Sequence, residues 1–331
     1  MVTGRIMRGM EPAPAPLPLP FRTLKPWLKE RYGRAVYRVA LDAGSTCPNR
    51  DGTKGVGGCT YCDVEGSGTG ALKGGDSLDE QLREGLKRIA RRRRRGLERA
   101  VEPGVIAYLQ SYSNTYVDTS RFREVLDVFR PHLRGQGGPL VAVAVATRPD
   151  CLPDESLRAL EDLSRETDVW LELGLETAND QVLIDINRLH TLEEFDDATT
   201  RARDAGLLTV GHAILGLPGD GRDGARATAE ALRRSGVDGV KVHHLMVLKK
   251  TQMAHQWRSG DLQVQTAEEY VDWLADFVER LGPDQVLHRI TGDSPEGKLL
   301  APIWSVPKNE IRERLRAELT ARGTEQGSRA N

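Results

Sequence analysis

The segment YRVALDAGSTCPNRDGTKGVGGCTYC, residues 37–62, joins a short apolar strand to a glycine-rich loop that carries three cysteines. These cysteines, Cys47, Cys59 and Cys62, follow the spacing C-x11-C-x2-C. Five glycines lie within residues 44–58, and glycine adopts positive φ freely, so the backbone can wrap closely around a bulky object. The segment therefore predicts a strand whose following loop holds something large.

An alternation of strand-like and helix-like segments continues along the chain. Ser77-x-x-Glu80 and Thr191-x-x-Glu194 have the pattern of capping boxes at helix starts. The repeat predicts an α/β fold with parallel strands and outer helices, curled by right-handed crossovers into a full or partial TIM-like barrel. A flat doubly wound sheet is the competing architecture. The expected strands are 37–41, 105–109, 140–146, 169–175, 207–215, 237–248 and, as a seventh, 285–290; the expected helices include 120–129, 154–166, 222–234, 264–281 and 310–321.

Residues 170–176, WLELGLE, divide into two faces when they form a strand. The leucines share one face, and Glu172, Gly174 and Glu176 share the other. A parallel sheet normally buries both faces among apolar residues. The acidic face therefore predicts a lumen that holds a polar ligand, and the alternative is a strand with one solvated face.

Composition sets the boundaries of the prediction. The chain has 331 residues, a formal net charge of −1, 39% hydrophobic and 29% charged residues, which suits a globular protein and argues against a strongly basic nucleic-acid scaffold. No apolar run has the length of a signal-peptide core or a membrane span, so we expect a cytoplasmic protein with no membrane partner. The expected parts are a disordered proline-rich lead-in (1–21), a core barrel (22–260), a C-terminal extension packed on the barrel (261–321) and a frayed tail (322–331).

The cysteine pattern indicates metal or redox chemistry. Iron–sulfur clusters normally take four cysteines, so three thiolates suit a cubane cluster with one open iron. Tyr61 lies between the paired cysteines, where it can cover an edge of a cluster or of a bound ligand. Structural zinc is the alternative, and it would need a fourth ligand such as Cys151 or a histidine. A redox dithiol is a further alternative.

The three-cysteine loop and the strand–helix repeat resemble the radical S-adenosylmethionine (SAM) superfamily, and within it the chain is similar to the YhcC-like family, relatives of the Elp3 radical SAM core. The resemblance covers about residues 22–305. Its motifs are Cys47-Pro-Asn-Arg-Asp-Gly-Thr53, Gly57-Gly-Cys-Thr-Tyr-Cys62, Tyr112-Ser-Asn-Thr-Tyr116, Thr147-Arg-Pro-Asp-Cys151, Trp170-Leu-Glu-Leu-Gly-Leu-Glu-Thr177, Gly216-Leu-Pro-Gly219, Gly236-Val-Asp-Gly239 and Leu299-Leu-Ala-Pro-Ile-Trp304.

The resemblance implies a partial (β/α)6 barrel with extra C-terminal helices. It also implies a [4Fe-4S] cluster on the three cysteines. The open iron would chelate the amino and carboxylate groups of SAM. An electron from a flavodoxin- or ferredoxin-type donor would cleave SAM to methionine and a 5′-deoxyadenosyl radical, which abstracts hydrogen from a substrate.

The same resemblance implies contacts for SAM. Gln110 and Ser111 stand where the superfamily often has a GGE-like motif, and they can hydrogen-bond the ammonium or carboxylate. Glu172 is a candidate for the ribose hydroxyls and His212 for the adenine. The structural alternative for Glu172 is that it and Glu176, on the same strand face, pair with Arg148 or Lys241. The structural alternative for His212 is that it is a core residue.

Lys241, His243 and His244 end the sixth strand, and we expect at least one of them to face the pocket. Asn187-Arg-Leu-His190 resembles a loop that usually has glycine where Leu189 stands.

Elp3-like relatives act on the wobble uridine of tRNA, which makes tRNA a candidate substrate. The arginine run 91–95 is then either an RNA-phosphate patch or a solvated helix end. Cys151 could carry a radical or ligate an auxiliary iron, but a buried, inert thiol is the preferred interpretation. A small-molecule substrate and a non-catalytic, zinc-stabilised binding module are the alternative functions. The oligomeric state is not predicted.

Overall fold

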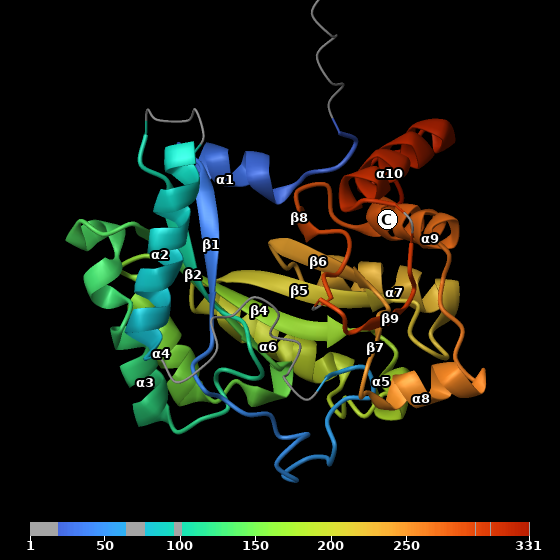
Figure 1. Cartoon of the computed structure of the whole chain (residues 1–331), viewed down its shortest axis with the longest axis horizontal. Coiled ribbons are helices and arrows are strands. Elements are labelled where there is room, and N and C mark those ends of the chain that lie inside the picture. Colours follow the sequence, from blue (N-terminus) through green and yellow to red (C-terminus); the bar gives the residue numbers. More distant parts are fainter. Residues whose placement is uncertain (1–18, 64–76, 96–100, 295, 305, 331) are drawn as a thin grey trace, which may run out of the picture.

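The structure is a computed structural model that describes residues 19–63, 77–95, 101–294, 296–304 and 306–330, without the side chains of 92–95 and 308. In this part of the chain seven parallel strands form one curled sheet (Figure 1), and two short strands form a separate antiparallel pair. The sheet contains, in spatial order, β1 (Val36–Leu41), β2 (Gly104–Leu109), β3 (Leu140–Thr147), β4 (Asp168–Glu176), β5 (Leu208–Leu215), β6 (Gly239–His244) and β8 (Val286–Arg289); the pair is β7 (Val247–Leu248) and β9 (Leu299–Ala301).

The strand order distinguishes the two predicted architectures. Each strand of the sheet pairs with the next strand along the chain, apart from the small β7, without the reversal of order that defines a doubly wound sheet. The sheet therefore curls in one direction into a half-barrel with β1 and β8 at its open edges. The partial barrel is confirmed, and the flat doubly wound sheet is wrong.

Helices cover the convex face of the half-barrel. In Figure 1, α2, α3 and α4 lie on the side of β1–β3, and α7, α9 and α10 lie on the side of β5, β6 and β8. The helices are α1 (Leu24–Tyr32), α2 (Leu78–Arg95), α3 (Thr119–Asp127), α4 (Asp154–Ser164), α5 (Asp180–Asp185), α6 (Leu192–Asp204), α7 (Gly221–Arg234), α8 (Gln252–Ser259), α9 (Ala267–Arg280) and α10 (Lys308–Arg322). Both predicted capping boxes are present, at Ser77 and Thr191.

The sheet has two differently packed faces. The leucines of β4, together with Val143 and Val145 of β3, lie in the main core beneath the helices. The opposite, concave face carries small residues such as Ala142 and Ala144 near the N-terminal end of the strands, and polar residues toward the C-terminal end. The predicted polar lumen therefore exists, on the face that sequence alternation assigned to Glu172.

Helix α1 closes this lumen at the N-terminal end of the strands. Leu28 is buried with Ile106 and Trp170 on the concave face, and the rings of Trp27 and Trp170 meet edge to face at 5.6 Å. Thr23 also forms a parallel bridge with Leu287 of β8. This helix was not predicted, and it spans from one open edge of the sheet toward the other.

The ends of the described chain differ from expectation. Residues 1–18 of the predicted lead-in lie outside the described residues, but Phe21 is buried in the main core. The tail predicted to fray is held in place: the Gln326 amide nitrogen donates to the carbonyls of Gly282 and Gln285, each at 2.7 Å, and the N–H of Arg329 donates to the Glu279 carbonyl at 2.8 Å. The prediction rested on the polar composition of the tail. In the structure, these polar groups form the hydrogen bonds that hold the tail against the rest of the protein.

The C-terminal helices pack against the helices that precede them. Helix α9 packs against α7, and α10 packs against α9. The arginine run ends α2, where Arg91 is exposed and lies 3.7 Å from Glu84, while the side chains of 92–95 lie outside the described residues. Within the described residues, no helix is long and apolar enough to cross a membrane.

Candidate functional site

The cysteine loop follows β1 at the C-terminal edge of the sheet, where barrel active sites lie. The carbonyl of Cys47 accepts the N–H of Arg50 at 2.8 Å, and that of Cys59 accepts the N–H of Cys62 at 2.9 Å, so both ends of the loop are tight turns. Gly58 has a φ of +80°, and a Cβ there would lie 3.2 Å from the Arg50 guanidinium. Glycine is therefore favoured beside the paired cysteines because of its φ, and a larger residue would also have to displace the Arg50 side chain slightly.

The segment after α5 clasps this loop. The Asn187 side chain donates to the carbonyls of Gly58 at 2.8 Å and Val56 at 3.2 Å. In return, the N–H of Thr60 donates to the carbonyl of Ile186 at 3.0 Å. The cysteine loop is thus positioned by a segment more than 120 residues away in sequence.

The segment after α5 that binds the cysteine loop has unusual backbone conformations. Asn187 and Leu189 have φ values of +55° and +61°, in the left-handed region that side chains other than glycine, asparagine and aspartate rarely adopt. Leu189 is the position where the resembled loop usually has glycine, so the leucine keeps a glycine-like conformation. Such conformations persist where the surrounding structure holds them, and they concentrate at functional sites.

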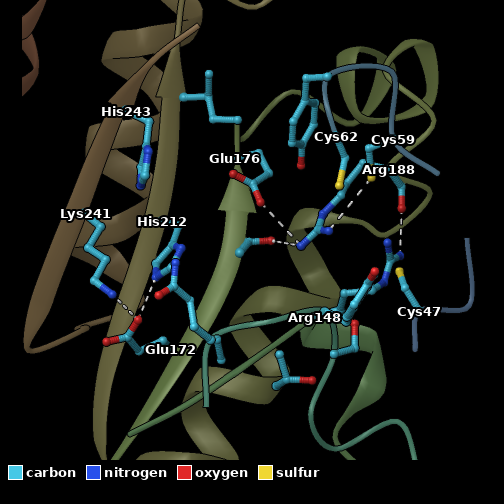
Figure 2. A pocket seen from close by; sticks show the side chains of 18 of the residues that line it. Cys47, Cys59, Cys62, Arg148, Glu172, Glu176, Arg188, His212, Lys241 and His243 are labelled. Carbon is cyan, nitrogen blue, oxygen red and sulfur yellow. Dashed lines mark hydrogen bonds and ion pairs between the residues drawn. The ribbon is translucent and has the colours of Figure 1, made fainter. Parts of the chain in front are cut away.

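The three cysteines line one cavity of about 350 Å³ at the C-terminal end of the half-barrel. Figure 2 shows Cys47, Cys59 and Cys62 on one side of it and Glu172, His212 and Lys241 on the other. This volume lies within the usual range for small-molecule sites. The structure therefore brings the predicted metal ligands together beside space for a ligand.

Arginines surround the cysteine side of the cavity. Arg50 Nη2 lies 3.3 Å from Cys62 Sγ, and Arg188 Nη1 lies 4.0 Å from Cys59 Sγ. Arg148 lines the same cavity and is almost fully buried. Three guanidinium groups therefore place positive charge on the cysteine side of the cavity.

The residues present fit a cluster with a second ligand. Arg148 Nη1 and Arg188 Nε are buried and have no hydrogen-bond partner among the described residues, so they can donate to an anionic group in the cavity. Gly174 lines the cavity, and a Cβ there would lie 2.5 Å from Arg188 and 2.6 Å from the Glu176 carboxylate, so the absence of a side chain lets these two residues pack against the backbone. The donor set and the positive charge suit an anionic iron–sulfur group.

The predicted contacts for SAM lie in different places. Tyr61 and Gln110 line the cavity with the cysteines. Ser111 is fully buried, its hydroxyl has no hydrogen-bond partner among the described residues, and it is not among the residues lining the cavity. Gln110 is therefore better placed than Ser111 for the role that the resemblance gave to both.

Glu172 is the centre of a buried charge network. It forms an ion pair with Lys241, its Oε2 accepts a hydrogen bond from His212 Nε2 at 3.2 Å, and its Oε1 lies 3.7 Å from Arg38 Nη2. The ammonium of Lys241 also donates to the Tyr108 hydroxyl at 3.2 Å. Glu172 and His212 both line the cavity, but the carboxylate predicted for the ribose is engaged mainly with Lys241, as the structural alternative expected.

The charges in this network are set by burial. Burial alone would raise the pKa of Glu172, but the charge of Lys241 holds that pKa well below its ordinary value. Burial lowers the pKa of Lys241 to about 7, against the opposite effect of Glu172, and burial also lowers the pKa of His212. Glu172 is therefore ionised, Lys241 changes charge near neutral pH, and the neutral His212 donates from Nε2.

Two other predicted pairings are different in the structure. Arg148 does not pair with a carboxylate of β4, because Asp150 binds its Nε and Nη2 at 2.8 Å each. Glu176 instead lies 3.4 Å from Arg188. Lys54 also contacts Asp150 at 2.6 Å. Residue types alone could not choose between these arginines, because the contacts depend on how two loops meet.

Cys151 does not line the cavity with the three cysteines. It is buried in a separate cavity beside Leu152 and Asp118. Burial raises the pKa of its thiol to about 12, so the thiol remains protonated. These observations favour the buried, inert thiol over a role of Cys151 as a fourth zinc ligand.

Sequence reasoning missed several residues of the cavity. Tyr112 has a φ of +59° and lies with its ring 5.8 Å from the Arg50 guanidinium carbon. Arg188 lies between the cysteines and β4, as Figure 2 shows. The tyrosine and the arginine both belong to segments that carried the family resemblance, which was the available signal. His243 and His244 both line the cavity with Lys241, as expected for the end of the sixth strand.

The chain is similar to known proteins over most of its length. It is 36% identical to the uncharacterized protein YtqA of Bacillus subtilis over 307 residues, 93% of this chain and 92% of that protein. It is 36% identical to the protein YhcC of Escherichia coli over 278 residues, 84% of this chain and 85% of that protein. The solved structure of the archaeal Methanocaldococcus infernus Elp3, with an N-terminal deletion, matches with a TM-score of 0.65 at 16% identity, over 88% of this chain and 64% of that chain.

The sequence profile described as Radical SAM superfamily matches residues 47–232, and the one described as Radical_SAM C-terminal domain matches residues 237–321. The first match begins at Cys47 and ends in α7. The Elp3 likeness supports the fold alone. The profile matches and the two bacterial relatives confirm the YhcC-like resemblance: the chain belongs to the radical SAM superfamily, which implies an enzyme that uses a [4Fe-4S] cluster and SAM.

Proposed function

We propose that this protein is a radical SAM enzyme in which Cys47, Cys59 and Cys62 hold the cluster and SAM binds in the adjoining cavity. The observation that carries the proposal is that all three cysteines line one cavity of about 350 Å³ at the C-terminal end of the half-barrel. When bound, the cluster and SAM supply a 5′-deoxyadenosyl radical, formed with an electron from a flavodoxin- or ferredoxin-type donor, that abstracts hydrogen from a substrate.

The side chains of the cavity have complementary roles in this proposal. The guanidinium groups of Arg50, Arg148 and Arg188 offset the negative charge of the thiolates. Gln110 provides an amide for the amino acid part of SAM, and Tyr61, partly buried beside the paired cysteines, limits the access of water. Glu172 and His212 form a polar wall opposite the cysteines, where His212 has its Nδ1 left as an acceptor.

The test is anaerobic reconstitution with iron and sulfide, followed by metal analysis and a dithionite-driven assay for 5′-deoxyadenosine. We expect about four irons per chain and deoxyadenosine formation in the wild-type protein. Cys62→Ala should lose both. Cys151→Ala is the matched control, because it removes a cysteine outside the cavity and should keep both. Stoichiometric zinc without iron or SAM cleavage would instead support the non-catalytic, zinc-stabilised binding module.

Two substrate classes follow from different observations. The Elp3-like sequence motifs motivate a tRNA wobble uridine side chain, whereas the cavity of about 350 Å³ beside the cysteines favours a small-molecule metabolite. The first predicts that deoxyadenosine formation increases with added tRNA and that tRNA binding weakens steeply with salt. The second predicts stimulation by a metabolite extract that has been treated with ribonuclease. A lack of tRNA binding at low salt would exclude the first.

A further inference from the structure

Three basic side chains gather on the side of the cavity away from the cysteines. They are Arg38 of β1, Lys241 of β6 and Arg289 of β8, and together they are called the basic subsite here; all three line the cavity. Lys241 and Arg289 are paired positions on neighbouring strands. Arg38 reaches across the open side of the half-barrel, so that its Nη2 lies 3.2 Å from Nδ1 of His288. The subsite therefore joins the two edges of the sheet, and Figure 2 shows its Lys241 opposite the cysteines.

The nearby carboxylates do not match this positive charge. Glu172 is shared between Lys241 and Arg38, with the Arg38 contact at 3.7 Å. Arg289 has an ion pair with Asp293 at 3.5 Å, and the side chain of Asp293 is 50% exposed. Among the described residues, Glu172 is thus the one buried carboxylate that pairs with the group. Lys241 is buried, and Arg38 and Arg289 are partly buried. Cations that are removed from water without full pairing carry a desolvation cost, which a bound anion offsets.

Arg38 has unused hydrogen-bonding capacity. Its Nε is buried and has no hydrogen-bond partner among the described residues. Burial and the charge of Arg38 keep the pKa of His288 well below its ordinary value, so His288 is neutral and accepts a hydrogen bond without offsetting charge. The guanidinium is held in place over the rings of Tyr108 and Trp170, each at 5.5 Å. A guanidinium fixed in this way is suited to bind an oxyanion through two N–H groups.

We propose that Arg38, Lys241 and Arg289 bind a carboxylate or phosphate group of the substrate, which makes the substrate an oxyanion-bearing molecule. The identification of the bound molecule as a substrate rests on the proposed radical SAM function, but the binding of an oxyanion by these three side chains does not. The ammonium of Lys241 has a pKa near neutrality without a ligand, and a bound anion would favour its charged form. The basic subsite lies across the cavity from the cysteines, so it would hold a substrate opposite the cluster.

The test is calorimetric titration of the full-length protein with inorganic phosphate, inorganic pyrophosphate and succinate in a buffer poor in other anions. The protein is titrated as purified and after reconstitution with iron and sulfide. Arg289→Gln and Arg38→Gln remove one guanidinium each from the subsite. Arg312→Gln removes one from the exposed surface of α10, where Arg312 forms an ion pair with Glu313, and is the matched control. Circular dichroism melting checks that each variant is folded.

We expect saturable binding of at least one probe, weakened about tenfold or more by each subsite variant and unchanged in Arg312→Gln. Binding of the phosphate probes alone would indicate a phosphate-bearing substrate, and binding of succinate alone a carboxylate-bearing one. No saturable binding up to about 10 mM, or binding that both subsite variants retain, would overturn the proposal. The same titration of Cys62→Ala should give wild-type binding, so failure of the cluster assignment and failure of the subsite are distinguishable.

Discussion

Arg188 connects the cysteine loop to the floor of the half-barrel. Its guanidinium lies 3.4 Å from Glu176, donates to the carbonyl of Gly174 at 3.1 Å and lies 4.0 Å from Cys59 Sγ. The residues on either side of it, Asn187 and Leu189, have left-handed backbone conformations. The strained segment therefore directs one buried cation between a carboxylate and a thiol.

Replacing Arg188 should be costly even in the cluster-free protein. Arg188→Gln leaves Glu176 buried without its partner, and breaking a buried ion pair costs about 3 kcal/mol. Urea unfolding measures the loss. Arg312→Gln on the surface should change the free energy of unfolding by less than about 0.5 kcal/mol. Equal effects of the two substitutions would contradict the assigned role of Arg188.

Asn187 allows backbone strain and side-chain bonding to be measured separately. Asn187→Gly keeps the left-handed φ but loses the bonds to Val56 and Gly58, so we expect a loss of about 1–2 kcal/mol. Asn187→Ala loses the same bonds and adds the strain of a Cβ at positive φ, so its loss should be about 1 kcal/mol larger. Urea unfolding of both variants gives the difference. An alanine variant as stable as the glycine variant would show that the backbone relaxes.

At the scale of elements, helices α7, α9 and α10 are joined by one carboxylate. Asp276 of α9 accepts hydrogen bonds from Arg222 and Arg226 of α7, at 2.7 Å each, and from Arg322 of α10 at 2.8 Å. Its side chain is only 3% exposed. The C-terminal helices are therefore attached to the barrel by a buried network of charges as well as by apolar packing.

This network should make stability depend on pH. Burial alone would raise the pKa of Asp276, but the arginines hold it well below its usual range. The unfolded chain consequently binds the proton more readily, so the stabilisation is complete above about pH 5 and is lost progressively as pH falls below that value. Asp276→Asn should cost about 2–3 kcal/mol at pH 7 and flatten the pH dependence below about pH 5. Urea unfolding from neutral to acid pH checks both, and parallel curves for the two proteins would refute the assignment.

For the whole molecule, the open side of the half-barrel is closed at one end by α1. Leu28 fills the lumen beside Trp170 at the N-terminal end of the strands. At the C-terminal end of the strands the lumen remains a cavity. The N-terminal end of the half-barrel is therefore packed and contributes to stability. The C-terminal end contains the cavity with the candidate functional residues.

Shortening Leu28 tests the contribution of the packed end. Leu28→Ala should lower the free energy of unfolding by about 3 kcal/mol, because it leaves a cavity in the lumen. Lys29→Ala on the exposed side of the same helix should have little effect. Chemical unfolding followed by tryptophan fluorescence measures both, since Trp27 and Trp170 adjoin the site. A Leu28 variant of wild-type stability would mean that α1 is not part of the core.

Much of this architecture could be predicted from periodicity. The seven strand segments were found because parallel strands are apolar and bounded by turn residues, and the alternation in β4 identified the face of Glu172. Helix α1 was missed because nine residues containing a proline give little helical signal; its position depends on Trp170, which is distant in sequence. The three cysteines were found from their spacing, whereas Arg38 and Arg289 were not, because their meeting depends on how far the sheet curls.

The hydrogen bonds of Arg22 have a consequence for how the molecule is made. Its N–H donates to the Gln326 side chain, 304 residues further along the chain. At a synthesis rate of about 5–20 residues per second, roughly 15 to 60 s pass between the two residues leaving the ribosome. During this interval Phe21 lacks its C-terminal neighbours, and β1 has no β8 across the open side. A nascent chain therefore exposes the apolar start of the barrel until its last helix is complete, which makes early strands a binding target for chaperones.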